Sequence, residues 1–295
     1  MLTKDEGYVY VVGYSNKFTQ STSSAKNPVV AKFQASDGAT VWSAGIGGNA
    51  QGEFNSVDIP DDDSYVYCSG TTQIWTATAS TDSGVLIQIS ATGSLQWVRS
   101  YSDGSNAVQF NSVVVLNDHS NIYTFGNKAA TSGIIVKWDS SGNDALALNL
   151  PNIKNLMAAD LFIDNSIIIF AGENSASKLY VGGLRLSDSS FILDKNFNVA
   201  STSASDISVN INGIMAIAGA VSSDGMIVNF DTELNDVCTA LDIQSQSTSA
   251  TSSSTSVATT QSSQTLHTIF PTMVSGTFNS TSTTTTLTSN TCGEV

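Results

Sequence analysis

Two stretches of the chain, FNSVDIPDDDSYVYCSG (residues 54–70) and FNSVVVLNDHSNIYTFG (residues 110–126), repeat one order of strand, turn and strand. Each begins with Phe-Asn-Ser-Val, continues through turn-forming Asp, Asn and Ser residues, and ends in an apolar run closed by glycine. Apolar residues in short, alternating runs indicate β-strands, because successive side chains of a strand point to opposite faces of the sheet. The two stretches therefore predict a repeated antiparallel unit.

The glycine-terminated strand occurs five times. Its final residues, Gly13, Gly70, Gly126, Gly172 and Gly219, are 57, 56, 46 and 47 residues apart. In the fourth and fifth units we place the strand before it at residues 157–163 and 206–211. Third strands follow at 29–33, 85–89, 134–138, 179–186 and 226–230, and a turn and a fourth strand come next. This spacing suits a four-stranded propeller blade. We predict an all-β, β-propeller-like array of about five four-stranded blades over residues 1–243, followed by a Ser/Thr-rich extended tail.

Large apolar residues recur four positions after a turn glycine. Trp42 and Trp97 occupy this place in the first two units and Leu146 occupies it in the third, so we expect them to pack one blade on the next. The whole unit resembles the SBBP-type β-propeller repeat. The segment ASDGATVW (residues 35–42) also resembles the tryptophan-docking repeats of quinoprotein-like propellers. The resemblance covers residues 7–243 and implies a fold, because these motifs are structural.

The first unit has no opening strand before its glycine-terminated strand. Residues 1–6 are too few and too polar to supply one, so Tyr8, Tyr10 and Val12 should form an open assembly edge. The C-terminal tail is the expected donor, because main-chain hydrogen bonds to an added strand need no particular side chains. A tail that folds back closes its own ring, whereas a tail that reaches a neighbour builds a homo-oligomer or filament. Both alternatives stay open.

Residues 244–295 differ sharply in composition from the rest. No Asp, Glu, Lys or Arg occurs from Ile243 to Gly293, and 29 of the 47 residues from Ser245 to Thr291 are Ser or Thr. A disordered linker, a densely O-glycosylated stretch and extended β structure are all compatible with this composition. We expect covalent glycans on Asn279, which begins an Asn-Ser-Thr sequon, and on hydroxyls such as those of Thr283, Thr284 and Thr285.

The three cysteines are too few for a disulfide framework. Cys68 lies inside an apolar strand, where a buried free thiol is expected. Cys238 and Cys292 bracket the tail, and we predict that they form a disulfide in an oxidising compartment.

Charge and hydropathy exclude several classes of function. Only 12% of residues are charged and the net charge is −14, which argues against nucleic acid and anionic membrane surfaces as partners. No apolar run approaches the length of a membrane span. The first seven residues show no signal peptide, which conflicts with an extracellular location unless the chain is processed or incomplete at its start. We favour an extracellular or cell-surface location.

No catalytic constellation is visible in the sequence. His119 lies in a turn and His267 in the tail, and the Asp-rich segments 61–63 and 139–144 fit solvated turns better than calcium sites. A quinone-dependent enzyme would need a basic residue and a metal site above the channel, and neither is identifiable. We therefore expect no enzyme activity and no cofactor. The favoured function is a structural subunit of a filament, coat or glycocalyx that assembles by strand sharing, and the alternative is a module that binds a glycan or a protein.

Overall fold

The computed structural model describes residues 1–16, 26–45, 51–73, 82–102, 106–129, 131–162, 166–200, 202–209, 215–221 and 224–230. It also describes four dipeptides of the tail, 245–246, 253–254, 260–261 and 267–268. Every regular element in these ranges is a β-strand, which confirms the predicted all-β fold class.

The strands from Tyr8 to Phe230 form five antiparallel sheets, which we call blades 1 to 5 in chain order. Blade 1 contains β1 (Tyr8–Ser15), β2 (Asn27–Gln34) and β3 (Thr40–Gly45). Blade 2 contains β4 (Gly52–Asp58), β5 (Tyr65–Thr72), β6 (Ser83–Ser90) and β7 (Leu95–Tyr101). Blade 3 contains β8 (Val108–Val115), β9 (Asn121–Lys128), β10 (Ser132–Asp139) and β11 (Asp144–Leu150). Blade 4 contains β12 (Ile153–Leu161), β13 (Ile167–Asn174), β14 (Lys178–Arg185) and β15 (Phe191–Ala200). Blade 5 contains β16 (Thr202–Val209), β17 (Met215–Val221) and β18 (Asp224–Phe230).

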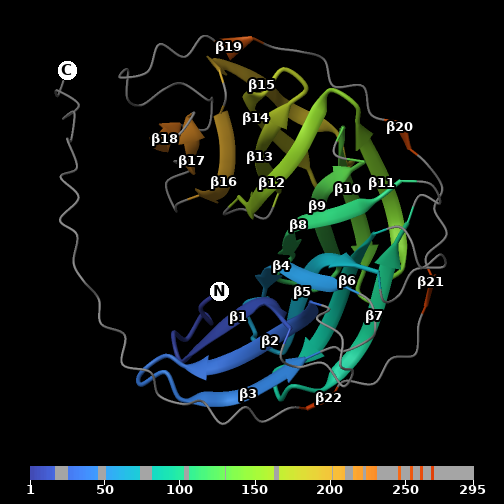
Figure 1. Cartoon of the computed structure of the whole chain (residues 1–295), viewed down its shortest axis with the longest axis vertical. Coiled ribbons are helices and arrows are strands. Elements are labelled where there is room, and N and C mark those ends of the chain that lie inside the picture. Colours follow the sequence, from blue (N-terminus) through green and yellow to red (C-terminus); the bar gives the residue numbers. More distant parts are fainter. Residues whose placement is uncertain are drawn as a thin grey trace.

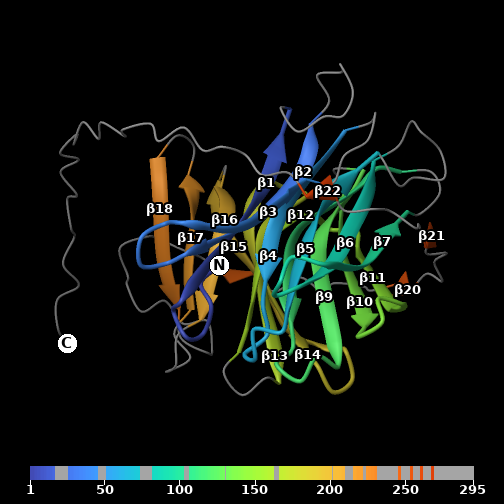
Figure 2. The same ribbon diagram turned by 90° about the horizontal axis from the view of Figure 1, so that it is seen from below.

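The blades follow one another around an arc, with blade 1 and blade 5 at its two ends (Figure 1). The opening strands β4, β8, β12 and β16 lie on the inner side, where each contacts the next. Most strands run between the two faces of the arc (Figure 2). This is the arrangement of a β-propeller whose inner strands surround a central channel.

The repeated glycine has a structural cause that the sequence alone did not reveal. Each inner strand of blades 2 to 5 contains a β-bulge opposite this glycine, as between Phe54 and Ser56 and between Phe110 and Ser112. The bulge presses a backbone carbonyl onto the glycine. A Cβ on Gly126 would lie 1.9 Å from the carbonyl oxygen of Gln109. Gly70, Gly172 and Gly219 meet equivalent oxygens at 1.9 to 2.0 Å, so no larger residue fits.

The predicted packing between blades is confirmed for the tryptophans. The ring of Trp42 lies against Gly93 in the last turn of blade 2, and its indole nitrogen donates to Ala91 O at 3.0 Å. Trp97 lies in the same way against Gly142 of blade 3. Both glycines have positive φ, 88° and 76°, which the turns require. Trp42 is buried and Trp97 is half-buried, so the cohesive role holds for both. Leu146 is half-buried against the apolar cluster shared by blades 3 and 4.

Two predictions about strand boundaries were wrong. The opening strands of blades 4 and 5 begin at Ile153 and Thr202, four residues before the predicted starts. Leu156 and Ala204 replace the phenylalanine of the repeat opposite the glycine, and this substitution disguised the register.

The first residues of the chain also behave differently from the prediction. Leu2 forms an antiparallel bridge with Val9. Tyr10 N donates to Met1 O at 2.8 Å, and Thr3 N donates to Tyr8 O at 2.9 Å. Residues 1–3 thus cover the first part of the inner edge of β1, because backbone pairing needs no apolar side chains.

The tail adds one strand to the outer edge of four sheets, as the fifth strand in blades 2, 3 and 4 and as the fourth strand in blade 1. β19 (Ser245–Gln246) pairs with β15, β20 (Ser253–Ser254) with β11, β21 (Thr260–Gln261) with β7, and β22 (His267–Thr268) with β3. Their starts are 8, 7 and 7 residues apart, and the four dipeptides lie on the outer edges of blades 4, 3, 2 and 1 in turn (Figure 1). We call these four dipeptides the belt. They cover edges that would otherwise be open to other strands.

Candidate functional site

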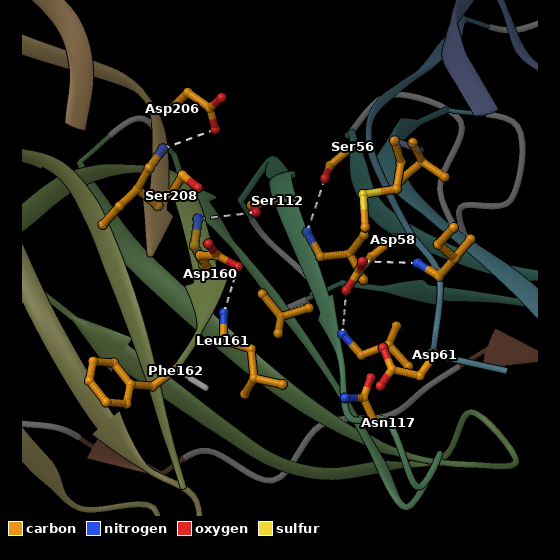
Figure 3. A pocket seen from close by; sticks show the side chains of 18 residues that line it. Ser56, Asp58, Asp61, Ser112, Asn117, Asp160, Leu161, Phe162, Asp206 and Ser208 are labelled. Carbon is orange, nitrogen blue, oxygen red and sulfur yellow. Dashed lines mark hydrogen bonds between the residues drawn. The ribbon is translucent and has the colours of Figure 1, made fainter. Parts of the chain in front are cut away.

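A cavity of about 560 Å³ lies at one end of the channel, where the inner strands β4, β8, β12 and β16 finish (Figure 3). We call it the funnel. Its polar lining residues are Ser56, Asp58, Asp61, Ser112, Asn117, Asp160, Asp206 and Ser208. No lysine or arginine of the described chain lines it, but the N-terminal ammonium of Met1 lies near enough to Asp58 to lower its pKa, and Lys4 forms an ion pair with the lining residue Asp61. The other lining residues have apolar side chains and include Phe162. The funnel is therefore a polar, acidic hollow.

The serines of the funnel belong to the Phe-Asn-Ser-Val repeat and join one blade to the next. Ser56 Oγ accepts Val113 N at 3.3 Å, and Ser112 Oγ accepts Ala159 N at 3.2 Å. Val113 and Ala159 occupy the same position in successive blades.

The asparagine of the repeat makes a parallel contact. Asn55 Nδ2 donates to Phe110 O at 2.9 Å, and Asn111 Nδ2 donates to Leu156 O at 2.8 Å. Asparagine and serine together form a two-point contact that we call the clasp. It satisfies backbone groups of the next inner strand that would otherwise face the channel. The Phe-Asn-Ser-Val motif is visible in the sequence, but this role is not, because the two partners of each hydrogen bond are more than forty residues apart.

Two aspartates of the funnel also accept hydrogen bonds from the backbone of the next blade. Asp58 Oδ2 accepts Val115 N of the next blade at 2.8 Å, and Oδ1 accepts Ile59 N at 2.9 Å. Asp160 repeats the arrangement with Val209 N and Leu161 N, both at 2.8 Å. Each carboxylate thus bridges two blades, and both side chains line the hollow (Figure 3).

Burial controls the protonation of these carboxylates. Removal from water raises the pKa of Asp58 to about 7, although the N–H groups of Val115 and Ile59 oppose the change. The charge of Asp160 adds to the increase, and burial likewise raises the pKa of Asp160. Asp206 is exposed at the rim. The funnel therefore holds a carboxyl group that titrates near neutral pH and would gain its charge more readily beside a cation.

Of the two Asp-rich turns, the first follows the inner strand β4 and contributes Asp61 to the funnel, whereas the second lies in the hairpin between β10 and β11. Asp62 Oδ1 lies 3.1 Å from His119 Nε2, and Asp139 Oδ1 accepts Ser141 N and Asn143 N at 2.9 Å inside its hairpin turn. Within the part of the chain that the structure describes, no group of three His, Cys, Asp or Glu side chains is placed to hold a metal ion. No helix in these ranges is long and apolar enough to cross a membrane.

The remaining predicted residues divide into two groups. Tyr8 and Tyr10 are paired through their backbones with residues 1–3, whereas Val12 lies beyond that pairing on the same edge. Cys68 is a buried free thiol, as predicted. The glycosylation and disulfide residues lie outside the described residues, so those sites stay predictions: Asn279, Thr283, Thr284, Thr285, Cys238 and Cys292.

The comparison with one solved structure, hydrazine synthase, supports the architecture, and two others give lower scores. Hydrazine synthase of Kuenenia stuttgartiensis is similar with a TM-score of 0.55 at 9% identity, over 80% of this chain and 66% of that one. The periplasmic gluconolactonase PpgL of Pseudomonas aeruginosa gives 0.47 at 10% identity, over 87% of each chain. The WD40 domain of Toxoplasma gondii coronin gives 0.46 at 11% identity, over 74% of this chain and 54% of that one. At such identities the likeness concerns the fold alone. No protein-family model and no curated protein matches the chain.

Proposed function

We propose that this protein is a non-enzymatic binding module, placed outside the cell or at its surface, that holds a small cationic ligand in the funnel. One observation carries the proposal: Asp58, Asp160 and Asp206 face a single hollow that no lysine or arginine of the described chain lines. A ligand with an ammonium or guanidinium group would donate to carboxylate lone pairs that the backbone leaves unused. The SBBP-type resemblance fits this role, since such repeats serve as scaffolds for varied sites.

The proposal makes affinity depend on pH in one direction. Because the pKa of Asp58 is about 7, the carboxyl group is largely protonated at pH 6 and largely ionised at pH 8. A cation binds the ionised form, so affinity should rise over this interval.

Titration calorimetry with free arginine and with spermidine tests the idea. Citrulline serves as the counterpart of arginine that lacks the guanidinium charge but keeps the α-ammonium and α-carboxylate groups. We expect binding of both cations, tighter at pH 8 than at pH 6, and much weaker binding of citrulline. Asp206→Asn should weaken binding several-fold, because Asp206 lies at the rim and, among the described residues, its carboxylate accepts a hydrogen bond from its neighbour Ile207 and bridges no other blade. Asp188→Asn, in an exposed turn of blade 4, is the matched control and should change nothing. Equal heats for arginine and citrulline would reject the proposal.

A second candidate function is structural, as a subunit that assembles by strand sharing. The observation that favours it is the edge of β1 beyond residues 1–3, where Val12 and Tyr14 carry no added strand from the described part of the chain. Sedimentation velocity over a hundredfold range of concentration tests it. Growing particles would support assembly, and monomers at every concentration would remove this candidate.

A further inference from the structure

Gly13 differs from its four counterparts in the other blades. It occupies the same register position, since Gly13 pairs with Val29 as Gly70 pairs with Val85 and Gly126 with Ile134. The other four glycines each hold a bulged carbonyl against the backbone, yet a Cβ on Gly13 would meet nothing within 4 Å. The edge of blade 1 at Gly13 could therefore accept a bulged opening strand like those of blades 2 to 5, but none of the described residues forms one there.

Two backbone groups of the neighbouring strand β4 also lack the hydrogen-bond partners that their counterparts in blades 3 and 4 have among the described residues. In blades 3 and 4, the inner strand receives the clasp of the preceding blade through the N–H of Val113 or Ala159 and the C=O of Phe110 or Leu156. The corresponding groups of β4 are Val57 N–H and Phe54 C=O. No described residue offers them an asparagine and a serine. The strand missing from blade 1 should therefore carry a clasp.

The tail contains a segment with the required sequence. GTFNST (residues 276–281) matches GEFNSV (residues 52–57) at the glycine, the phenylalanine, the asparagine and the serine, and Thr281 replaces Val57 with another β-branched residue. Phe-Asn-Ser occurs only three times in the chain, twice in inner strands and once here. In a Ser/Thr-rich tail, this segment stands out by its phenylalanine and asparagine.

The position of the belt places the start of residues 276–281 within reach of blade 1. β22 pairs with β3, so the chain reaches the outer edge of blade 1 at Thr268, eight residues before Gly276. Crossing three strands to the inner edge covers roughly 20 Å at about 4.8 Å per strand. Eight residues extend over about 26 Å, so the tail of the same chain can reach.

We propose that residues 276–281 form the opening strand of blade 1 in their own chain, with the bulge at Asn279 and Phe278 opposite Gly13. The register of blade 2 then places Ser280 opposite Val12 and Thr281 opposite Val11. Asn279 Nδ2 donates to Phe54 O, and Ser280 Oγ accepts Val57 N. Residues 1–3 continue the same line along Tyr8 and Tyr10. The inference is independent of the ligand in the funnel.

This assignment conflicts with the predicted glycan on Asn279. The amide nitrogen that would carry sugar is the one that the clasp uses. Peptide mapping of protein from a glycosylating host should find Asn279 unmodified while hydroxyls elsewhere in the tail carry sugar. Full occupancy of Asn279 would contradict the assignment.

A stability test uses Gly13→Val in the full chain. If the strand is seated, the new side chain meets the carbonyl of residue 277, and the Tm should fall by about 5 °C or more, in the range expected for a few kcal/mol in a domain of this size. Gly70→Val is the positive control, because Glu53 O already lies 1.9 Å from its Cβ position. An unchanged or higher Tm for Gly13→Val, with a lower one for Gly70→Val, would overturn the proposal.

Cross-linking decides whether the strand belongs to the same chain. Odd-numbered residues of β1 turn their backbone groups to β2, as Gly7 O does in accepting Ala35 N, so Val11 and Thr281 would form a close pair without mutual hydrogen bonds. Val11 is 50% exposed and accessible to oxidant. Val11→Cys with Thr281→Cys should give a disulfide within monomers at high dilution, and Val11→Cys with Thr285→Cys should give far less. Cross-linked dimers, or equal yields for both pairs, would refute closure within one chain.

Discussion

Replacement of Gly126 by alanine tests the physical reason for the repeat. The added Cβ would lie 1.9 Å from Gln109 O, whereas ordinary contacts begin near 3.4 Å, so the bulged strand β8 must shift by about 1.5 Å. That strand carries the clasp of Asn111 and Ser112 to blade 4. Overpacking costs about 1–3 kcal/mol and each weakened hydrogen bond about 1 kcal/mol, while the lost flexibility of glycine returns less than 1 kcal/mol. We expect a net loss of about 3 kcal/mol.

Equilibrium unfolding in guanidinium chloride, followed by tryptophan fluorescence, measures this loss. Gly133→Ala in the adjacent strand β10 is the matched control. Its Cβ would meet Leu156 Cγ at 3.2 Å and Ile153 Cβ at 3.3 Å, which are side-chain atoms that can yield. The control should cost about 1 kcal/mol or less. If Gly126→Ala is no more damaging than Gly133→Ala, the bulge does not explain the glycine.

Three further outcomes follow from the core and the blade contacts. The pKa of Asp58 rises from 3.8 to about 7 on folding, so its contribution to stability is complete below pH 4 and is lost as the pH rises through 7, by up to about 4 kcal/mol. Asp58→Asn should flatten the pH dependence of the unfolding free energy over this range, and an unchanged slope would exclude Asp58 as its source. Burial raises the pKa of the Cys68 thiol, so a maleimide should label it at the rate of global unfolding, and rapid labelling of native protein would contradict its burial. Arg99 donates to Gly142 O at 2.9 Å and to Ser141 O at 2.8 Å, so Arg99→Lys should lower the Tm by several degrees, whereas Arg185→Lys in an exposed turn should not.

The blades could be predicted from the sequence because the repeated residues are ones that form turns or pack in the core. Gly70 and Gly126 marked the second strand, and Trp42 and Trp97 marked the fourth. The reason for the glycines could not be predicted, since it lies in a bulge on the partner strand. The predicted starts of β12 and β16 were wrong because Leu156 and Ala204 occupy the position that phenylalanine has in the other opening strands.

The funnel was beyond sequence analysis for a different reason. Asp58 and Asp160 occupy equivalent positions, but blade 3 has Val114 there, so no repeat of carboxylates is visible along the chain. Only the curvature of the arc brings them to one hollow. The pairing of residues 1–3 and the belt was equally hidden, because both depend on backbone groups rather than on side-chain pattern.

The contact between successive blades has a direction. Trp42 of blade 1 lies on the turn glycine of blade 2, and Trp97 of blade 2 lies on the turn glycine of blade 3. In both junctions the earlier blade supplies the tryptophan and the later blade supplies the turn glycine. Because blade 2 takes part in both contacts in the same way, neither junction depends on how many blades the protein has. A gene that gains or loses one whole repeat would still encode matching junctions, so blade number can vary in evolution without the invention of a new interface.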